Sequence, residues 1–495
     1  MMANVKFNIG LDFGTFQSKA CLFHTSANPQ KHEFVQFRNH SGKNSYFFPS
    51  RVYFKNTNTF AYGYSSDTDI KSMFTFFKIA SAEDEHFRIM TGIESSKSVY
   101  RREEFGGFSP ELLSSLYITH MLFTIKDKVK KANQVQPTTG LFRRFATASQ
   151  NDVTFTVQLG IPTEYSNTVN LMRRRKFENI LLVSEMLQKE VSGLTEFDSL
   201  SVANVIDLVK GCLSKINETA TTLDKFKSLL NEYSVSVYPE AAAGLTFLVR
   251  TKHLEPGHYI ALDIGGGSSD LSFFYVMKDN RIKYLASEAF MAAANDIYRQ
   301  FSQKDLPTFD DLHNAEHQIT SLLKSRDWED HKEYLNSVSE VTSKLYDRLY
   351  HIFNERVYWY FDRCKGTKAF KNQPCFVFGG GARLPIPEGF RQVCIHDNGQ
   401  PACPNLHTYA QRTNIDNYIP IVGILPDDNS WKKDFGLLVV AFGLSFLHND
   451  NETYWDLDEY KAYPHHIDVS PELIPHPFNE DMYIYDILAA KWNKS

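Results

Sequence analysis

The feature that most constrains this chain is a run of three glycines between two strand-like segments, in IALDIGGGSSDLSFF (260–274). A glycine removes a side chain and adds backbone freedom, so three in a row weaken any strand that contains them. Taken alone, such a turn is as readily a structural bulge as a binding site. Its other explanation is that something approaches the main chain closely there. The glycines are Gly265, Gly266 and Gly267, with Asp263 and Asp270 on either side.

The same construction occurs at the start of the chain. VKFNIGLDFGTFQSKACLF (5–23) is again a strand-like run, an acid at Asp12, a glycine turn with a hydroxyl residue, and a second strand-like run. The turn contains Gly14, Thr15 and Phe16. Two such hairpins, separated by about half the chain, predict two lobes with related cores that face a common cleft.

The chemistry of the two turns predicts a phosphate ligand together with a metal ion. Successive main-chain N–H groups in a glycine turn form a concave site that prefers anions. Asp12 and Asp263 would repel a polyphosphate, unless a cation lies between them. Magnesium binds through one or two carboxylates, several waters and the phosphates themselves, so we expect both aspartates to hold Mg²⁺, mostly through water. Thr15 and Ser268 add hydroxyl donors.

A third glycine turn follows a strand-like run in PCFVFGGGARLPIP (374–387). Glycine permits close approach of a flat ring or a sugar, and the guanidinium of Arg383 can stack on an aromatic base. A tight strand-to-helix turn explains this segment equally well when it is taken alone. In combination with the two hairpins, Gly380, Gly381 and Arg383 suggest the place of an adenine.

The remaining periodicity indicates an α/β fold. Apolar residues recur at helical spacing from Glu111 and again from about 170, and a strand from Val153 ends before Pro162. Residues of about 188–232 predict an inserted helical element, and 334–361 predict a long amphipathic helix.

Five segments resemble, in order, the nucleotide-site motifs of the actin, sugar kinase and heat-shock chaperone superfamily, and most closely those of the seventy-kilodalton heat-shock chaperone ATPase domain. The resemblance implies a two-lobed actin-like ATPase fold with duplicated ribonuclease H-like cores and a central nucleotide cleft. Residues 1–256 and 257–447 would form the two lobes, and 448–495 an acidic, aromatic tail. The segments are IGLDFGTFQSK, VYPEAAAG, LDIGGGSSDLS, VFGGGARLP and VVAFGLSFL.

The resemblance also implies roles for individual residues around ATP or ADP with magnesium. The catalytic residues would be Glu240, Asp263 and Asp12, with Glu240 placing the attacking water and both aspartates holding hydrated Mg²⁺. Pro162 would relay the nucleotide state between lobes. Contacts to the nucleotide would come from Gly14, Thr15, Phe16, Gly265, Gly266, Gly267, Ser268, Gly380, Gly381 and Arg383.

Three departures from the chaperone pattern affect what we expect. Asp67 stands where the chaperones carry a catalytic lysine, so either a neighbour, Lys71 or Lys78, takes that role or hydrolysis is impaired. Ala293 and Ala294 replace a glycine pair near the ribose. The 48 residues after 447 are too few for a peptide-binding domain and its lid.

We therefore expect a chaperone-like, weak Mg-dependent ATPase whose lobe closure controls a protein partner through the tail or the helical insertion. Three alternatives stay open. They are an actin-like filament-forming ATPase, a pseudo-ATPase that binds nucleotide without turnover, and a small-molecule kinase or polyphosphate phosphatase of the same superfamily.

Composition excludes several other classes. A net charge of -5 argues against a nucleic-acid-binding surface, and RRRK (173–176) is most simply the solvated face of a helix. The longest apolar run, 435–447, is too short to span a bilayer, so we expect a cytoplasmic protein without membrane contact.

One segment carries four possible metal ligands close together. It either holds zinc or forms a polar loop with reduced thiols. The four residues are Cys394, His396, Cys403 and His407.

Overall fold

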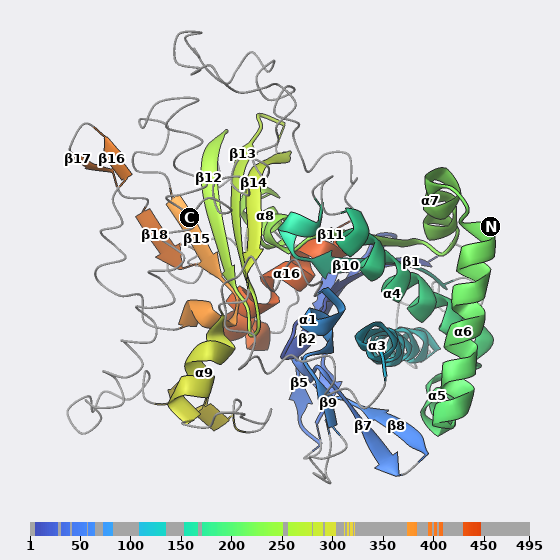
Figure 1. The fold of residues 1–495 in the computed structure, drawn as a ribbon. Coiled ribbons are helices and arrows are strands. Elements are labelled where there is room, and N and C mark those ends of the chain that lie inside the picture. Colours follow the sequence, from blue (N-terminus) through green and yellow to red (C-terminus); the bar gives the residue numbers. More distant parts are fainter. Residues whose placement is uncertain are drawn as a thin grey trace, which may run out of the picture.

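The structure is a computed structural model of mixed α/β type (Figure 1). It describes residues 5–27, 31–39, 42–56, 58–64, 73–82, 108–134, 153–166, 171–250, 256–279, 281–290, 293–302, 374–383, 395–397, 400–402, 405–408 and 429–446, with 311, 314, 315, 317–319 and 321. Asp67, Lys71, the expected helix at 334–361 and the tail at 448–495 lie outside these residues.

The first large sheet contains both strands of the N-terminal hairpin. Its order is β11-β10-β1-β2-β3, and β6 (Phe48–Pro49) also pairs with β2. The strand β1 runs parallel to β10 and antiparallel to β2, while β10 is parallel to β11 and β2 antiparallel to β3. The bounds are β1 (Val5–Asp12), β2 (Gln17–His24), β3 (Lys31–Phe34), β10 (Val153–Ile161) and β11 (Val235–Pro239).

The second large sheet repeats this arrangement with the second hairpin. Its order is β14-β13-β12-β15-β18. Here β12 runs antiparallel to β13 and parallel to β15, β13 is antiparallel to β14, and β15 is parallel to β18. The two sheets therefore share one order and one set of strand directions. The bounds are β12 (Gly257–Ile264), β13 (Ser269–Val276), β14 (Ile282–Phe290), β15 (Pro374–Phe378) and β18 (Asn405–Thr408).

Two helices, α8 (Glu240–Arg250) and α16 (Phe435–Ser445), lie between the sheets (Figure 1). Although α16 comes late in the chain, it packs on β1, β2 and β10 of the first sheet and crosses α8. It is apolar all round, as expected of a helix enclosed by protein. Within the residues that the structure describes, no helix combines the length and the hydrophobicity needed to cross a membrane.

The predicted helices near 111 and 170 are α3 (Pro110–Gln134) and α4 (Leu171–Glu190), which pack against each other. Both predictions are confirmed, as is the strand β10, which ends at Ile161 directly before Pro162. The segment expected to be helical holds α5 (Leu194–Ser199), α6 (Val202–Thr219) and α7 (Leu223–Glu232). Ser201 and Thr222 cap α6 and α7 by accepting main-chain N–H bonds.

The prediction that RRRK (173–176) is a solvated face is wrong. Arg173 is buried and lies 5.4 Å from the Tyr165 ring, and Arg175 lies 3.8 Å from the Phe226 ring. The run instead joins α4 to its neighbours, because a guanidinium can pack flat on an aromatic face.

Smaller elements complete the fold. One three-stranded sheet has the order β8-β7-β9, and two hairpins pair β4 with β5 and β16 with β17. The bounds are β4 (Phe37–Arg38), β5 (Asn44–Ser45), β7 (Arg51–Asn56), β8 (Thr59–Tyr62), β9 (Met73–Thr75), β16 (Ile395–Asp397), β17 (Gln400–Ala402), α1 (Phe77–Ala82), α9 (Ala294–Ser302), and the 3₁₀ turns η6 (Thr163–Ser166), η11 (Gly380–Arg383) and η12 (Asn429–Asp434).

Candidate functional site

The turns of both predicted hairpins line one cavity of about 100 Å³. This is smaller than the roughly 300–1,000 Å³ typical of ligand pockets, but it has room for several waters. The lining includes Asp12, Gly14, Thr15, Phe16, Gln17, Lys19, Lys78, Pro162, Glu240, Asp263, Gly265, Gly266, Ser268, Asp270, Ala294, Asn295, Tyr298, Gly379, Gly380, Gly436, Leu437 and Val440.

The two hairpin turns are built alike. In each, the first glycine comes two residues after an aspartate, which is the last residue of β1 in the first hairpin and the next-to-last residue of β12 in the second. A Cβ on Gly14 would lie 2.1 Å from the Gln17 carbonyl oxygen, and a Cβ on Gly265 would lie 2.7 Å from the Ser268 carbonyl oxygen. Because both contacts join a glycine to the residue three positions later, neither turn has room for a side chain at that place.

The third glycine turn packs directly against the end of β12. Gly379 has a φ of +83°, and a Cβ there would lie 2.2 Å from Oδ1 of Asp263. A Cβ on Gly381 would lie 2.1 Å from the Ile264 side chain, whereas one on Gly380 would meet nothing within 4 Å. Gly379 and Gly381 therefore allow two strand ends to approach, and Gly380 faces open space.

The two aspartates have opposite cross-strand partners. Asp12 pairs in register with Lys19, and Asp263 pairs in register with Asp270. The Lys19 Nζ donates to Oδ2 of Asp12 at 2.9 Å. The first hairpin thus carries its own counter-charge, whereas the second places two carboxylates side by side.

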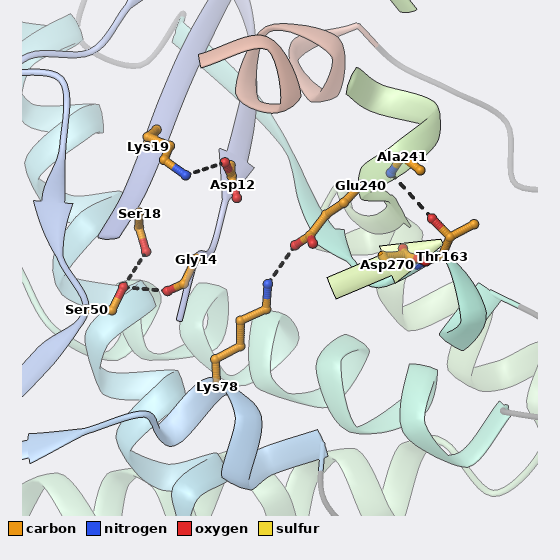
Figure 2. A network of polar contacts seen from close by, with 10 residues as sticks. All are labelled: Asp12, Gly14, Ser18, Lys19, Ser50, Lys78, Thr163, Glu240, Ala241 and Asp270. Atoms are coloured by element: carbon orange, nitrogen blue, oxygen red, sulfur yellow. Dashed lines mark hydrogen bonds and ion pairs between the residues drawn. The ribbon is translucent and has the colours of Figure 1, made fainter. Parts of the chain in front are cut away.

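A second lysine reaches the cavity from α1. The Nζ of Lys78 donates to Oε1 of Glu240 at 2.7 Å, and both side chains are buried. Figure 2 shows the two side chains pointing toward one another from α1 and α8. Lys78 also lies 5.9 Å from the centre of the Phe13 ring. Of the two lysines named in the sequence as neighbours of Asp67, Lys78 is the one that the structure describes.

Residue Thr163 links the second sheet to the start of α8. Its main-chain N–H donates to Oδ2 of Asp270, and its Oγ1 accepts a bond from the Ala241 N–H at 3.4 Å (Figure 2). Glu240, the first residue of α8, is thereby held next to a turn that contacts β13.

The glycine turn of the first hairpin is held by a hydrogen bond of its own. The Ser50 hydroxyl donates to the Gly14 carbonyl at 2.6 Å.

Three carboxylates of the cavity, those of Asp263, Asp270 and Glu240, bind protons more tightly than usual, so each has a raised pKa. Burial, followed by repulsion from Glu240, Asp12 and Asp270, raises the pKa of Asp263 well above its ordinary value. Burial raises the pKa of Asp270 to about 7. The pKa of Glu240 is raised by burial in spite of Lys78. Burial lowers the pKa of Lys19, but the surrounding carboxylates, Asp12 first, outweigh it and raise the pKa overall.

The donor set fits an anion that arrives with a cation. Four carboxylates face two lysines in the lining, and among the described residues those lysines form salt bridges with Asp12 and Glu240 and not with Asp263. Oxygen ligands of this kind suit Mg²⁺, which keeps several waters. Lys19, Lys78 and the glycine turns suit phosphate oxygens. Within the described residues, no group of three or more His, Cys, Asp or Glu side chains has the geometry of a metal site made by protein alone.

Most of the predicted site residues meet in this cavity. Gly267 and Gly381 are buried next to it but do not belong to its lining. Arg383 ends η11, and its side chain lies outside the described part of the chain. The predicted residues that line the cavity are Asp12, Gly14, Thr15, Phe16, Glu240, Asp263, Gly265, Gly266, Ser268 and Gly380.

Sequence reasoning missed several lining residues. Lys19 could have been found, because its place in the first hairpin matches that of Asp270 in the second. Asn295 and Tyr298 carry no motif and enter only through the path of α9.

The zinc hypothesis falls mostly outside the described residues. His396 lies in β16 and His407 in β18, while Cys394 and Cys403 are not described.

Comparison of the chain with protein-family models and with curated proteins finds no match in either set.

Proposed function

We propose that this chain binds ATP with magnesium in the cavity and hydrolyses it slowly, as a two-lobed ATPase of the actin, sugar kinase and heat-shock chaperone type. One observation carries the proposal. Two hairpins of the same construction, on sheets of the same strand order, bring their glycine turns and the aspartates that precede those turns to a single cavity.

Charge explains why a metal nucleotide suits this cavity better than either component alone. A polyphosphate would be attracted by Lys19 and Lys78, and it would be repelled by Asp263 and Asp270 whenever these two carboxyl groups have released their protons. Magnesium, when bound, would offset the charge of the phosphates and of these aspartates. Asp263, which forms no salt bridge with a lysine in the described part of the chain, would depend on the metal more than Asp12, which is paired with Lys19.

The residues around Glu240 suit a hydrolytic step. Attack of water on a terminal phosphate needs a positioned water and neutral surroundings more than covalent catalysis. Glu240 would accept a hydrogen bond from that water and take its proton, while Lys78 holds the carboxylate in place. Asp67 stands where the chaperones carry a catalytic lysine, and Lys78 would supply the positive charge in its place. This favours an ATPase that turns over ATP above a pseudo-ATPase.

A nucleotide bound in the cavity would contact the turns of both sheets at once, so we expect its binding to close one sheet against the other. Such closure is the usual output of slow nucleotide switches. We assign its target to a protein partner, reached through α5–α7 or the segment 448–495, as in a chaperone-like protein. The actin-like alternative predicts polymer, which light scattering on addition of ATP would detect.

Calorimetry of the full chain with ATP, with and without Mg²⁺, tests the proposal. Wild-type protein should bind ATP, and Mg²⁺ should strengthen binding. Asp263→Asn should weaken the Mg-dependent part by about 10- to 100-fold, because a carboxylate that holds the metal through water is lost.

The control is Asp279→Asn, at an exposed aspartate that is paired with Arg281 just beyond β13. It should bind Mg-ATP as the wild type does. Absence of ATP binding to the wild type would refute the proposal, and so would equal binding by Asp263→Asn.

A further inference from the structure

One buried residue near the cavity holds a strained backbone conformation. Phe76 has a φ of +61°, in the left-handed region, and its side chain is buried. Among the residues that the structure describes, Ser234 is the only other non-glycine residue with a positive φ. A bulky residue in this region costs free energy, so the conformation persists only where the surrounding structure imposes it. The strain at Phe76 therefore indicates a place where the direction of the chain matters.

Phe76 is the single residue between β9 and α1, and its backbone sets the direction of that helix. Thr75, the last residue of β9, pairs in register with Arg51 of β7. Phe77 begins α1, and the Ala80 N–H donates to the Phe76 carbonyl at 3.1 Å with helical spacing. An extended residue at this position would continue the strand and would carry α1 away from its place.

The two residues after Phe76 both reach the candidate site. The Phe77 ring stacks on the ring of Phe13, which directly precedes the first glycine turn, with 6.0 Å between the ring centres. The Nζ of Lys78 donates to Oε1 of Glu240 at 2.7 Å. Lys78 is the second residue of a helix of only six residues, so the turn before the helix decides where this lysine points.

We propose that Phe76 is a positioning residue for hydrolysis, whose left-handed backbone aims α1 so that Lys78 meets Glu240. This inference rests on the proposed function for its effect on turnover. Phe76 does not belong to the lining of the cavity, so it would act through Lys78 and not on the nucleotide. A relaxed backbone at this position would leave the Glu240 carboxylate without its bond from Lys78.

Two isomeric side chains separate the role of the backbone from that of the ring. Phe76→Leu and Phe76→Ile introduce apolar groups of equal volume, but a β-branched residue tolerates the left-handed region less well than leucine does. At saturating Mg-ATP, the kcat of Phe76→Ile should be about 10-fold below that of Phe76→Leu, because Lys78 is misplaced. The Kd for Mg-ATP, measured by calorimetry of the full chain, should agree within about 3-fold, since Lys19 and both glycine turns remain.

A smaller pair repeats the test in case Phe76→Ile does not fold. Glycine adopts the left-handed region freely and alanine does not. The kcat of Phe76→Gly should therefore exceed that of Phe76→Ala, although glycine leaves the larger gap in the packing.

The control applies the same isomeric pair to the other left-handed residue. Ser234 is exposed, lies between α7 and β11, and is not part of the cavity lining. Ser234→Ile should melt at a lower temperature than Ser234→Leu, because it carries the same backbone conflict. The kcat should be the same in both.

A double-mutant cycle tests the route of the effect. In a Lys78→Met background, the ratio of kcat between Phe76→Leu and Phe76→Ile should fall to about 1, because the lysine through which Phe76 acts is already lost. An unchanged ratio would mean that Phe76 acts by another route, and it would overturn the proposal.

The outcomes separate the two proposals. If the wild type hydrolyses ATP and the variants of each Phe76 pair share one kcat, the positioning role is overturned and the ATPase stands. If the wild type does not hydrolyse ATP, the proposed function fails, and crystal structures of the ligand-free Phe76 variants decide the positioning role. The bond from Lys78 to Glu240 should be present in Phe76→Leu and broken in Phe76→Ile, and an intact bond in both would overturn the assignment.

Discussion

At the scale of single residues, the two lysines distinguish the carboxylates of the cavity. Lys78 holds Glu240 and Lys19 holds Asp12, each through a bond shorter than 3 Å. Asp263 and Asp270 are paired with each other across the second hairpin instead. Four acids in one cavity therefore differ in what they can do, because their immediate partners differ in charge.

The first residue-scale prediction concerns turnover. Glu240→Gln should bind Mg-ATP within about 3-fold of the wild type and hydrolyse it about 100-fold more slowly, because an amide cannot take the proton of the attacking water. The amide oxygen can still accept from Lys78, so the variant should fold. Phosphate release measured at saturating ATP checks this.

Its control is Glu190→Gln, at an exposed residue of α4 that is paired with Lys215. This change should leave turnover as it is. If Glu240→Gln hydrolysed ATP at the wild-type rate, Glu240 would have no role in the reaction.

A second residue-scale prediction concerns pH. The pKa of Asp270 is about 7 in the folded chain, against an ordinary value of 3.8. The folded state therefore holds a proton that the unfolded state has released between these values, and the contribution of Asp270 to stability falls as pH rises through this range. Because an asparagine does not titrate, Asp270→Asn should remove this pH-dependent loss of stability. Its free energy of unfolding, relative to wild type, should rise by ~1 kcal/mol or more from pH 5 to pH 8.

Urea denaturation at both pH values measures the difference. Asp279→Asn is the control, because burial acts to raise the pKa of Asp279 but hydrogen bonds from Arg281 lower it overall. It should show no such rise. A constant difference between Asp270→Asn and the wild type across this range would contradict the assigned burial of Asp270.

At the scale of elements, glycines decide how α16 fits between α8 and the first sheet. A Cβ on Gly443 would lie 1.8 Å from the Ala243 carbonyl oxygen of α8, and a Cβ on Gly10 of β1 would lie 2.2 Å from the Ser445 nitrogen. Both contacts are with main-chain atoms, which cannot rotate away. The helix can approach its neighbours this closely only without these side chains.

The matched pair Gly443→Ala and Gly436→Ala tests this packing within one helix. Gly443→Ala should destabilise the chain by about 1–3 kcal/mol, since the added methyl forces two helices apart. A Cβ on Gly436 would meet nothing within 4 Å. Gly436→Ala should therefore be neutral or stabilising by up to about 1 kcal/mol, through helix propensity. Thermal and urea unfolding of both variants measure the effect, and equal stabilities would contradict the packing.

At the scale of the whole molecule, the sequence predicted what local pattern determines. The hairpins at Asp12 and Asp263 and the end of β10 before Pro162 follow from strand periodicity and glycine or proline turns. The repeated motif also predicted that the glycine turns of the two hairpins face a common cleft, and both turns line one cavity.

What the sequence did not predict depends on the path of the chain. Lys78 meets Glu240 across 162 positions, and Asn295 reaches the cavity because α9 is fixed to the Gly265–Gly266 turn. The packing of Arg175 on Phe226 likewise joins residues far apart in the chain. Such contacts arise from how elements assemble, and no local spacing encodes them.

The exchange of Lys19 for Asp270 at matching positions has one more consequence. Under the proposed function, a bare phosphate would be attracted by Lys19 in the first hairpin and repelled by the carboxylates of Asp263 and Asp270 in the second. Only the joint arrival of anion and metal would satisfy both halves at once. The molecule would then act as a coincidence detector, whose closing reports the complex and ignores either component by itself.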